Sequence, residues 1–265
     1  MSRSETPGFG EVAEKLRRST VLIYPQGGPE GGSGSGVIWS SGGLILTNAH
    51  VARTREAGVE LWDGRRFSAR VSARDPRRDL AALTIDAPPL DAATPGDSRA
   101  LRPGELVIAI GNPLGFAGAL STGIVHSIGK QWIYADVRLA PGNSGGPLAD
   151  AAGRVVGINT AIVNGLGAAI PSATALDFVR NGACPSLGVS LRPVHLGLLL
   201  LEVDPDGAAA AAGLRPADIV LGGLEELHAA LDSGGETMRV RFLRGDLRRV
   251  RETVVRLAAR VEAAA

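Results

Sequence analysis

Short apolar runs, separated by residues that end strands, occupy the chain from Ser19 to Ile170. Gly, Pro, Asp or Asn interrupts these runs repeatedly, which is typical of strands joined by turns. No helical segments alternate with the runs, and this excludes the βαβ pattern of a parallel sheet. The region is therefore predicted to form antiparallel all-β sheets closed into barrels or sandwiches. The candidate strands are 19–24, 35–40, 43–47, 58–62, 67–73, 79–85, 105–110, 119–128, 131–137, 153–163 and 167–171.

Glycine is unusually abundant and supports this interpretation. The chain has 36 glycines among 265 residues, about twice the usual share of roughly 7%. They show no collagen period, so they indicate many tight turns and hence many short strands. Aromatic residues make up only 4% of the chain, and we therefore expect a core of Val, Leu, Ile and Ala.

The charges are nearly balanced, since 28 Lys and Arg against 27 Asp and Glu give a net charge of +1. This balance argues against a nucleic-acid or membrane-surface binder. The single cysteine, Cys184, excludes an intramolecular disulfide and any Cys-based zinc or iron–sulfur site within this sequence. The arginines near the C-terminus are expected on solvated strand and turn faces, with an anionic partner as the alternative. They are Arg239, Arg241, Arg244, Arg248, Arg249, Arg251, Arg256 and Arg260.

No motif indicates a bound nucleotide or metal ion. The glycine-rich stretch 27–36 lacks the Lys-Ser/Thr pair of a phosphate-binding loop, and it opens a strand rather than a helix. We interpret it as a loop and expect no cofactor.

The pattern of expected strands and helices changes along the chain and divides it into two parts. A helix-like segment, Ser172–Arg180, ends at Asn181-Gly182, which is a plausible helix cap. Shorter strands and Ala-rich helices follow, which predicts a second, α+β domain. The predicted division is an N-terminal segment 1–18, a first domain 19–183 and a second domain 186–260. In the second domain the expected strands are 186–192, 196–203, 218–221, 236–243 and 249–256, and the expected helices are 207–213 and 224–231.

The N-terminal segment 1–18 carries charges of both signs and no apolar run. It therefore does not resemble a secretory signal, and we interpret it as a short amphipathic helix. No stretch approaches the ~18 apolar residues of a membrane span. These features favour a cytoplasmic protein with no membrane span, with an extracytoplasmic location as the alternative.

The segment 142–148, Gly-Asn-Ser-Gly-Gly-Pro-Leu, suits a nucleophilic serine. Small neighbours of Ser144 would let a substrate carbonyl approach, and backbone N–H groups could converge on the oxyanion that forms. The alternative is an ordinary Gly-rich turn. A serine hydroxyl is a poor nucleophile until a base accepts its proton, so the hypothesis requires a positioned histidine.

His50 is the best candidate for the base, because it directly follows the apolar strand 43–47 and could point into a cleft. For the other histidines, His126, His195 and His228, a structural or solvated role is expected. A carboxylate must orient the imidazole and stabilise its protonated form. Asp79, at the head of a buried run, is preferred over Asp75, which lies in a charged turn before a proline.

The order His50, Asp79, Ser144 is that of the chymotrypsin-like proteases. The chain resembles a trypsin-like serine protease of the HtrA/Deg family with one C-terminal PDZ domain. The segments that carry the resemblance are 34–38 (GSGVI), 44–51 (LILTNAHV), 79–83 (DLAAL), 108–113 (IAIGNP), 123–125 (GIV), 142–148 (GNSGGPL) and 157–160 (GINT).

The resemblance implies an all-β double barrel of the chymotrypsin type, with the site in the cleft between the barrels. It also implies that the backbone N–H groups of Gly142 and Ser144 are the oxyanion donors, with Asn143 as a conformational support. The residues implied to line the primary specificity pocket are Leu139, Ile158, Thr160 and Ala161. Their modest apolar side chains favour small or medium aliphatic residues before the cleaved bond.

One departure from the family pattern is Arg138, six residues before the nucleophile, where the family usually has a small residue. If Arg138 pointed into the pocket, it would attract an acidic side chain of the substrate. We expect it to point outward instead, because a buried unpaired guanidinium is costly.

The second domain resembles a small PDZ domain. The residues matching its carboxylate-binding loop are Leu187, Gly188 and Val189, which would receive a peptide C-terminus while the peptide adds as a strand. Ala217 replaces the more usual glycine of a family turn, and only Gly222-Gly223 separate strand 219–221 from the next helix, where relatives carry a longer hairpin. Peptide binding and a merely structural appendage therefore both stay open.

The resemblance implies an ATP-independent serine endopeptidase that cleaves unfolded or damaged proteins. In this hypothesis His50 is general base and acid, Asp79 its orienting partner and Ser144 the acylated nucleophile. The alternative is a catalytically silent peptide-binding or holdase module. The resemblance also implies a homotrimer held by residues near the N-terminus, for which Phe9 is suitably placed.

Overall fold

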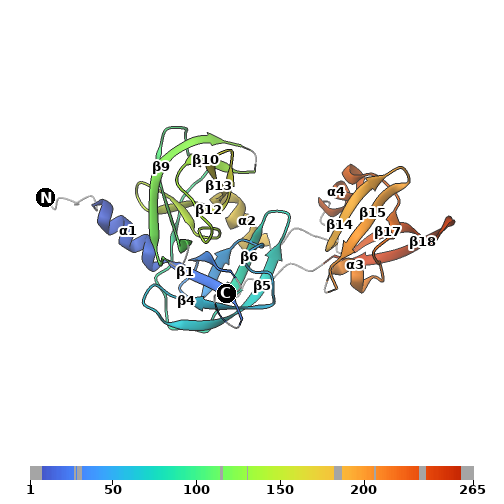
Figure 1. Cartoon of the computed structure of the whole chain (residues 1–265), viewed down its shortest axis with the longest axis horizontal. Coiled ribbons are helices and arrows are strands. Elements are labelled where there is room, and N and C mark those ends of the chain that lie inside the picture. The colour runs from blue at the N-terminus through green and yellow to red at the C-terminus, as the bar shows by residue number, and fades with distance from the viewer. Residues whose placement is uncertain are drawn as a thin grey trace. The chain divides into compact units, whose positions relative to one another are not determined.

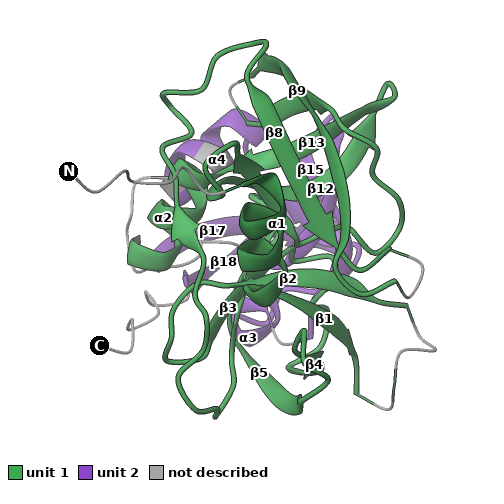
Figure 2. Cartoon of the chain, turned by 90° about the vertical axis from the view of Figure 1, so that its left-hand side faces the viewer, with its two compact units in different colours: residues 1–182, 263–265 green, residues 183–262 purple. Residues whose placement is uncertain are grey.

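The structure is a computed structural model that divides into two compact units, residues 1–182 with 263–265 and residues 183–262 (Figure 2). Each unit is described by itself. The structure describes residues 8–26, 28, 32–113, 116–129, 131–181, 187–205, 207–232 and 237–257.

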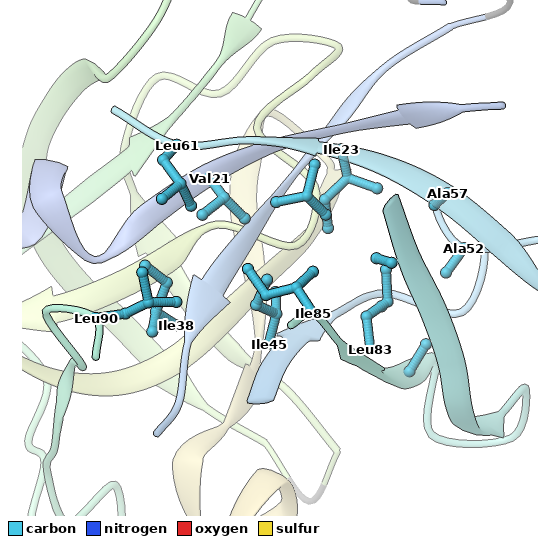
Figure 3. Packing of buried hydrophobic residues seen from close by; sticks show 13 residues of the cluster. Val21, Ile23, Ile38, Ile45, Ala52, Ala57, Leu61, Leu83, Ile85 and Leu90 are labelled. Atoms are coloured by element: carbon cyan, nitrogen blue, oxygen red, sulfur yellow. The ribbon is translucent and has the colours of Figure 1, made fainter. Parts of the chain in front are cut away.

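The first barrel is a closed ring in the order β1-β2-β3-β6-β5-β4. Figure 1 labels β1, β4, β5 and β6 of this barrel. Antiparallel pairing of β4 with β1, for example Glu60 opposite Leu22, closes the ring. The strands are β1 (Thr20–Pro25), β2 (Gly34–Ile38), β3 (Leu44–Thr47), β4 (Glu56–Glu60), β5 (Arg66–Asp75) and β6 (Leu80–Thr84). Figure 3 shows that branched aliphatic side chains such as Val21, Ile38 and Leu83 fill its interior, as the scarcity of aromatic residues predicts.

The second barrel closes in the same way, because β11 pairs with both β8 and β12. The ring order is β11-β8-β9-β10-β13-β12, and the short strand β7 adds in parallel to β12. The strands are β7 (Thr94–Pro95), β8 (Leu106–Gly111), β9 (Ala119–Ile128), β10 (Ile133–Asp136), β11 (Pro147–Asp150), β12 (Arg154–Val163) and β13 (Leu166–Pro171). The expected double barrel is confirmed.

Strand β11 is absent from the strands predicted from the sequence. It is four residues long, begins at Pro147 and follows Gly145-Gly146. Proline is tolerated at the first position of a strand because the missing N–H is not needed there. The tertiary structure decides this element, since pairing with β8 and β12 buries Leu148 and Ala149 completely.

Two helices accompany the barrels. Helix α1 (Phe9–Arg18) buries Val12 and Leu16, while Arg17 and Arg18 stack on the Trp62 ring at 5.3 and 4.9 Å from its centre. Helix α2 (Ser172–Asn181) follows β13 directly and leads toward the second unit. Within the part of the chain that the structure describes, every helix is too short or too polar to traverse a lipid bilayer.

The second unit is a five-stranded sheet in the order β14-β15-β16-β17-β18 with two short helices, which confirms the expected small α+β fold. The elements are β14 (Val189–Val194), β15 (Gly197–Val203), α3 (Ala208–Ala211), β16 (Ile219–Val220), α4 (Leu224–Asp232), β17 (Thr237–Arg244) and β18 (Asp246–Arg256). Its own core includes Leu187, Leu200, Leu231 and Val240.

Candidate active site

His50 lies in the turn after β3, where the end of a buried strand presents it to solvent. Its ring Nδ1 is 2.8 Å from Asp79 Oδ2 and 3.0 Å from Asp79 Oδ1, and its backbone N–H donates to the same carboxylate at 3.0 Å. The two side chains are thus held together by three contacts. This geometry fixes one ring nitrogen on the carboxylate and leaves Nε2 for another partner.

Asp79 occupies an unusual backbone conformation just before β6, with φ of 53°. Aspartate tolerates the left-handed region better than most residues, because its short side chain makes local hydrogen bonds. The side-chain amide of Asn48 donates to the Asp79 carbonyl at 3.0 Å and supports this conformation. The turn therefore presents the carboxylate to His50 from the head of β6, whose first four residues are buried.

The Asp79 carboxylate is stabilised in its charged form. Burial alone would raise the pKa of this carboxyl, but the hydrogen bonds from His50 and Thr160 outweigh burial and hold the pKa below its ordinary value. The hydroxyl of Thr160 donates to Asp79 Oδ2 at 2.5 Å. An ionised acid at this position suits a partner that must stabilise an imidazolium.

Ser144 lies beside the same cavity as His50. Its hydroxyl donates to the carbonyl of Thr160 at 3.1 Å. The cavity has a volume of about 430 Å³, and both His50 and Ser144 line it. Hydrogen bonds between a nucleophile and its base are often long before substrate binds; for Ser144 to donate to His50, its hydroxyl would have to leave the Thr160 carbonyl.

The backbone N–H groups around Ser144 fall into two sets. Those of Asn143, Gly145 and Gly146 donate to the carbonyls of Ala140, Asn159 and Asn143. Those of Gly142 and Ser144 have no acceptor among the described residues. One of these two N–H groups belongs to the candidate nucleophile and the other lies two residues before it. Such a pair of donors is what an oxyanion site requires.

Glycine is required on both sides of Ser144. A Cβ at Gly142, with φ of 104°, would lie 2.5 Å from the Asn112 carbonyl oxygen. A Cβ at Gly145, with φ of 88°, would lie 2.0 Å from the Ser35 carbonyl oxygen. The loop therefore packs directly against β2 and the end of β8, and no side chain can replace these glycines without moving the backbone.

The predicted pocket residues are placed as follows. Leu139 packs against the core of the second barrel and against Gly167, where a Cβ would lie 3.0 Å from its methyl group. Ile158 is fully buried and Ala161 is half-buried. Arg138 is exposed, and its backbone N–H donates to Ser121 Oγ at 2.9 Å. The pocket assignment stays a prediction.

The competing acid Asp75 is fully buried and serves the turn that precedes Asp79. Its Oδ1 accepts the backbone N–H groups of Arg77 and Arg78, and its Oδ2 accepts Arg78 Nε at 2.6 Å. Arg78 also contacts Asp177 of α2 at 2.6 Å. This role of Asp75 was not expected from the sequence. The sequence signal for it is an Asp at the start of a turn, because such an Asp commonly accepts the backbone N–H groups that follow it, as in an Asx-turn.

The remaining histidines and the loop residues of the second unit are also placed. His126 and His195 are exposed, whereas the side chain of His228 lies outside the described residues. Leu187 is buried, and Gly188 has φ of 69°. The carbonyls of Leu187 and Gly188 accept the N–H groups of Ala209 and Asp204.

Comparison with known proteins identifies the class. A family model described as a trypsin-like peptidase domain matches residues 34–158, the stretch that contains His50, Asp79 and Ser144. A Synechocystis protein named as the serine protease HhoB is 38% identical over 234 residues, which cover 72% of this chain and 56% of that protein. A Halomonas elongata protein named as a DegP-like periplasmic serine endoprotease is 39% identical over 221 residues, covering 71% and 47%.

Solved structures agree with this class over nearly the whole chain. The HtrA-type protease AlgW with a decapeptide has a TM-score of 0.63 at 26% identity, covering 96% of this chain and 99% of that one. The serine endoprotease from Yersinia pestis has a TM-score of 0.65 at 29% identity, covering 97% and 99%. The chain therefore has a trypsin-like peptidase domain, and its homologues and structural neighbours are HtrA/DegP-like serine proteases.

The length of the relatives and the compartment given in their names both bear on function. The chain spans about half the length of the curated relatives it matches. Several relatives, including those of Halomonas elongata and Marinomonas, are named as periplasmic. The expectation of a cytoplasmic location is therefore wrong, because the lack of an apolar run in residues 1–18 does not report the compartment in which such proteases work.

Proposed function

We propose that this chain is a serine endopeptidase that works through an acyl-enzyme. The observation that carries the proposal is one site with three features: a His50–Asp79 pair at 2.8 Å, Ser144 lining the same cavity, and N–H groups at Gly142 and Ser144 that find no acceptor among the described residues. A Gly-rich turn without catalytic function would not need a half-buried acid aligned on an exposed imidazole.

The steps follow from these positions. Ser144 Oγ leaves the Thr160 carbonyl and gives its proton to His50 Nε2 as it attacks the scissile carbonyl carbon. The carbonyl oxygen becomes an oxyanion and accepts the N–H groups of Gly142 and Ser144. As the oxyanion collapses, the C–N bond breaks and His50 protonates the leaving amine, which leaves the acyl group on Ser144. A water molecule, deprotonated by His50, then attacks the acyl carbon, and His50 returns the proton to Ser144 Oγ as the bond to the acid product breaks. Asp79 stays ionised throughout and stabilises the imidazolium.

The proposed substrates are unfolded or damaged polypeptides, cleaved without ATP after small or medium aliphatic residues. The predicted pocket residues Leu139, Ile158 and Ala161 support this preference because their side chains are apolar. The exposed position of Arg138 supports the outward orientation expected for it. A cleavage profile with strong preference for Asp or Glu before the scissile bond would contradict this part of the proposal.

For the second unit we propose peptide binding at strand β14. This strand is an edge of the sheet, and Leu187, Gly188 and Val189 lead into it. An added peptide could pair with Val189–Arg192, whereas Pro193 offers no N–H for a longer ladder. The AlgW structures with a decapeptide and a tripeptide support peptide recognition in a relative of this fold.

We further propose that the chain works outside the cytoplasm, as the names of the periplasmic relatives suggest. We also propose that it forms a homotrimer. Phe9 at the start of α1 is 50% exposed, which suits an aromatic contact between copies. An unchanged particle mass for Phe9→Ala in light scattering would contradict that role of Phe9.

Casein digestion tests the proposed function. Wild-type protein should degrade unfolded casein, and Ser144→Ala should lose this activity almost completely while keeping its fold. Ser68→Ala, which removes an exposed hydroxyl on β5, is the matched control and should retain activity. A folded wild-type sample that binds casein without cleaving it would instead support the silent holdase alternative.

A further inference from the structure

Ser35 is a fully buried serine on β2, directly beneath the loop that carries Ser144. It belongs to the first barrel, whereas the loop belongs to the second, and the two are far apart in the sequence. The mechanism above assigns Ser35 no role. Its hydrogen bonds nevertheless converge on that loop.

Two of these bonds hold the loop on either side of Asn143. The Ser35 backbone N–H donates to the Ser144 carbonyl at 2.7 Å. The Ser35 hydroxyl donates to the Gly142 carbonyl, also at 2.7 Å. The two residues gripped in this way, Gly142 and Ser144, are those whose own N–H groups lack an acceptor among the described residues.

Other bonds hold Ser35 itself in place. Its carbonyl accepts the Thr47 hydroxyl at 2.6 Å, within the first barrel. Its hydroxyl oxygen accepts the backbone N–H of Asn112 at 2.8 Å and the side-chain amide of Asn112 at 3.2 Å, at the end of β8 in the second barrel. One donor and two acceptor positions are all that a hydroxyl has, so its hydrogen-bonding capacity is filled.

From this arrangement we propose that Ser35 is a positioning residue for the oxyanion site, an inference that rests on the proposed function. Gly142 has φ of 104° and no side chain to restrict it, so its peptide groups can rotate easily. The peptide group that follows Gly142 is held at both ends: the Ser35 hydroxyl donates to its carbonyl, and its N–H, that of Asn143, donates to the Ala140 carbonyl. These two bonds restrain rotation about Gly142. Together they aim the Gly142 N–H at the position where the oxyanion forms.

The role predicts a specific kinetic signature. Misplacing an oxyanion donor weakens binding of the transition state but not of the ground-state substrate. In Ser35→Ala, the Gly142 carbonyl loses its donor and the Asn112 N–H loses its acceptor, so the loop can relax. We expect kcat for a fluorogenic peptide with valine before the scissile bond to fall on the order of 10- to 100-fold, with little change in KM.

An inhibitor pair separates positioning from general damage. A peptide aldehyde forms a hemiacetal with Ser144 whose oxygen occupies the oxyanion site, whereas the matching peptide alcohol does not. In Ser35→Ala, the affinity for the aldehyde should fall by about the same factor as kcat/KM, and the affinity for the alcohol should stay close to that of the wild type.

Ser172 provides a matched control. It is also fully buried, its hydroxyl donates to the Gly96 carbonyl at 2.7 Å, and it accepts the Ser98 N–H at 3.2 Å, all away from the site. Ser172→Ala should lower the melting temperature as Ser35→Ala does, yet keep kcat and both affinities. If Ser35→Ala does not fold, Ser35→Cys, which replaces the hydroxyl by a weak donor, is compared with Ser172→Ala in the same way.

The inference is overturned if Ser35→Ala keeps a kcat within about twofold of Ser172→Ala, or if its affinities for aldehyde and alcohol fall equally. A wild-type protein that neither cleaves the peptide nor binds the aldehyde more tightly than the alcohol would refute the proposed function itself. The two failures are therefore distinguishable.

Discussion

The hydroxyl of Thr160 donates a hydrogen bond of 2.5 Å to the carboxylate of Asp79. The backbone carbonyl of the same residue accepts the hydroxyl of Ser144 at 3.1 Å. Thr160 on β12 therefore connects the acid of the first barrel to the candidate nucleophile of the second. From the sequence, Thr160 is expected only among the residues of the specificity pocket.

Removing the Thr160 hydroxyl should impair catalysis more than stability. A hydrogen bond to a charged group contributes more than a neutral one, so Thr160→Val should lower kcat/KM for casein-derived peptides about tenfold. Thr160→Ser keeps the hydroxyl and should retain most of the activity. Equal rates for the valine and serine variants would show that the contact with Asp79 does not assist the reaction.

The lowered pKa of Asp79 makes stability depend on pH. Its folded pKa lies below the ordinary value, so the carboxylate stabilises the fold fully above the unfolded pKa of about 3.9. That contribution is lost as the pH falls through the lower folded pKa. The difference in unfolding free energy between wild type and Asp79→Asn should therefore stay constant above about pH 5 and shrink as the pH falls from about pH 5 to pH 2 in urea titrations. A difference that stays constant over this range would contradict the assigned pKa direction.

The ion pair between Arg78 and Asp75 should matter far more than the one between Arg78 and Asp177. Asp75 is fully buried, and Arg78→Met leaves its charge without the guanidinium, which should cost about 2–3 kcal/mol of unfolding free energy. The Asp177 side chain is 54% exposed, so Asp177→Asn should cost less than about 1 kcal/mol. Similar losses for both variants in chemical denaturation would show that burial does not set the strength of these pairs.

Ala217 should be improved by glycine. It is exposed and holds φ of 70°, a conformation that costs a residue with a Cβ about 1–2 kcal/mol. After the entropic cost of glycine in the unfolded chain, Ala217→Gly should stabilise the second unit by about 0.5–1 kcal/mol. Ala211→Gly, at an exposed position of helix α3, should destabilise it. A lower melting temperature for Ala217→Gly would show that this turn is not strained.

The sequence predicts well those features that depend on neighbours in the chain. Alternating apolar runs and glycine turns indicate both barrels, and the segments around His50, Asp79 and Ser144 identify the candidate site. The sequence prefers Asp79 to Asp75 as the acid, which stays a prediction; in the structure Asp79 contacts the His50 ring and Asp75 accepts N–H groups of the preceding turn.

Features that depend on barrel closure could not be predicted in this way. Strand β11 is short and begins at Pro147, so only its two partner strands define it. The contacts of Ser35 with Gly142, and of Thr160 with Asp79, join residues on different barrels. Local propensity contains no information on which buried hydroxyl will face which carbonyl across such an interface.

Covalent labelling tests directly whether Ser144 is a nucleophile activated by His50. Folded wild-type protein is treated with diisopropyl fluorophosphate, digested and mapped by mass spectrometry, in parallel with His50→Ala. We expect an adduct on Ser144 of the wild type and very little on the same residue of His50→Ala, because the hydroxyl then lacks its base. An unlabelled Ser144 in the folded wild type, or equal labelling of the two proteins, would contradict this expectation.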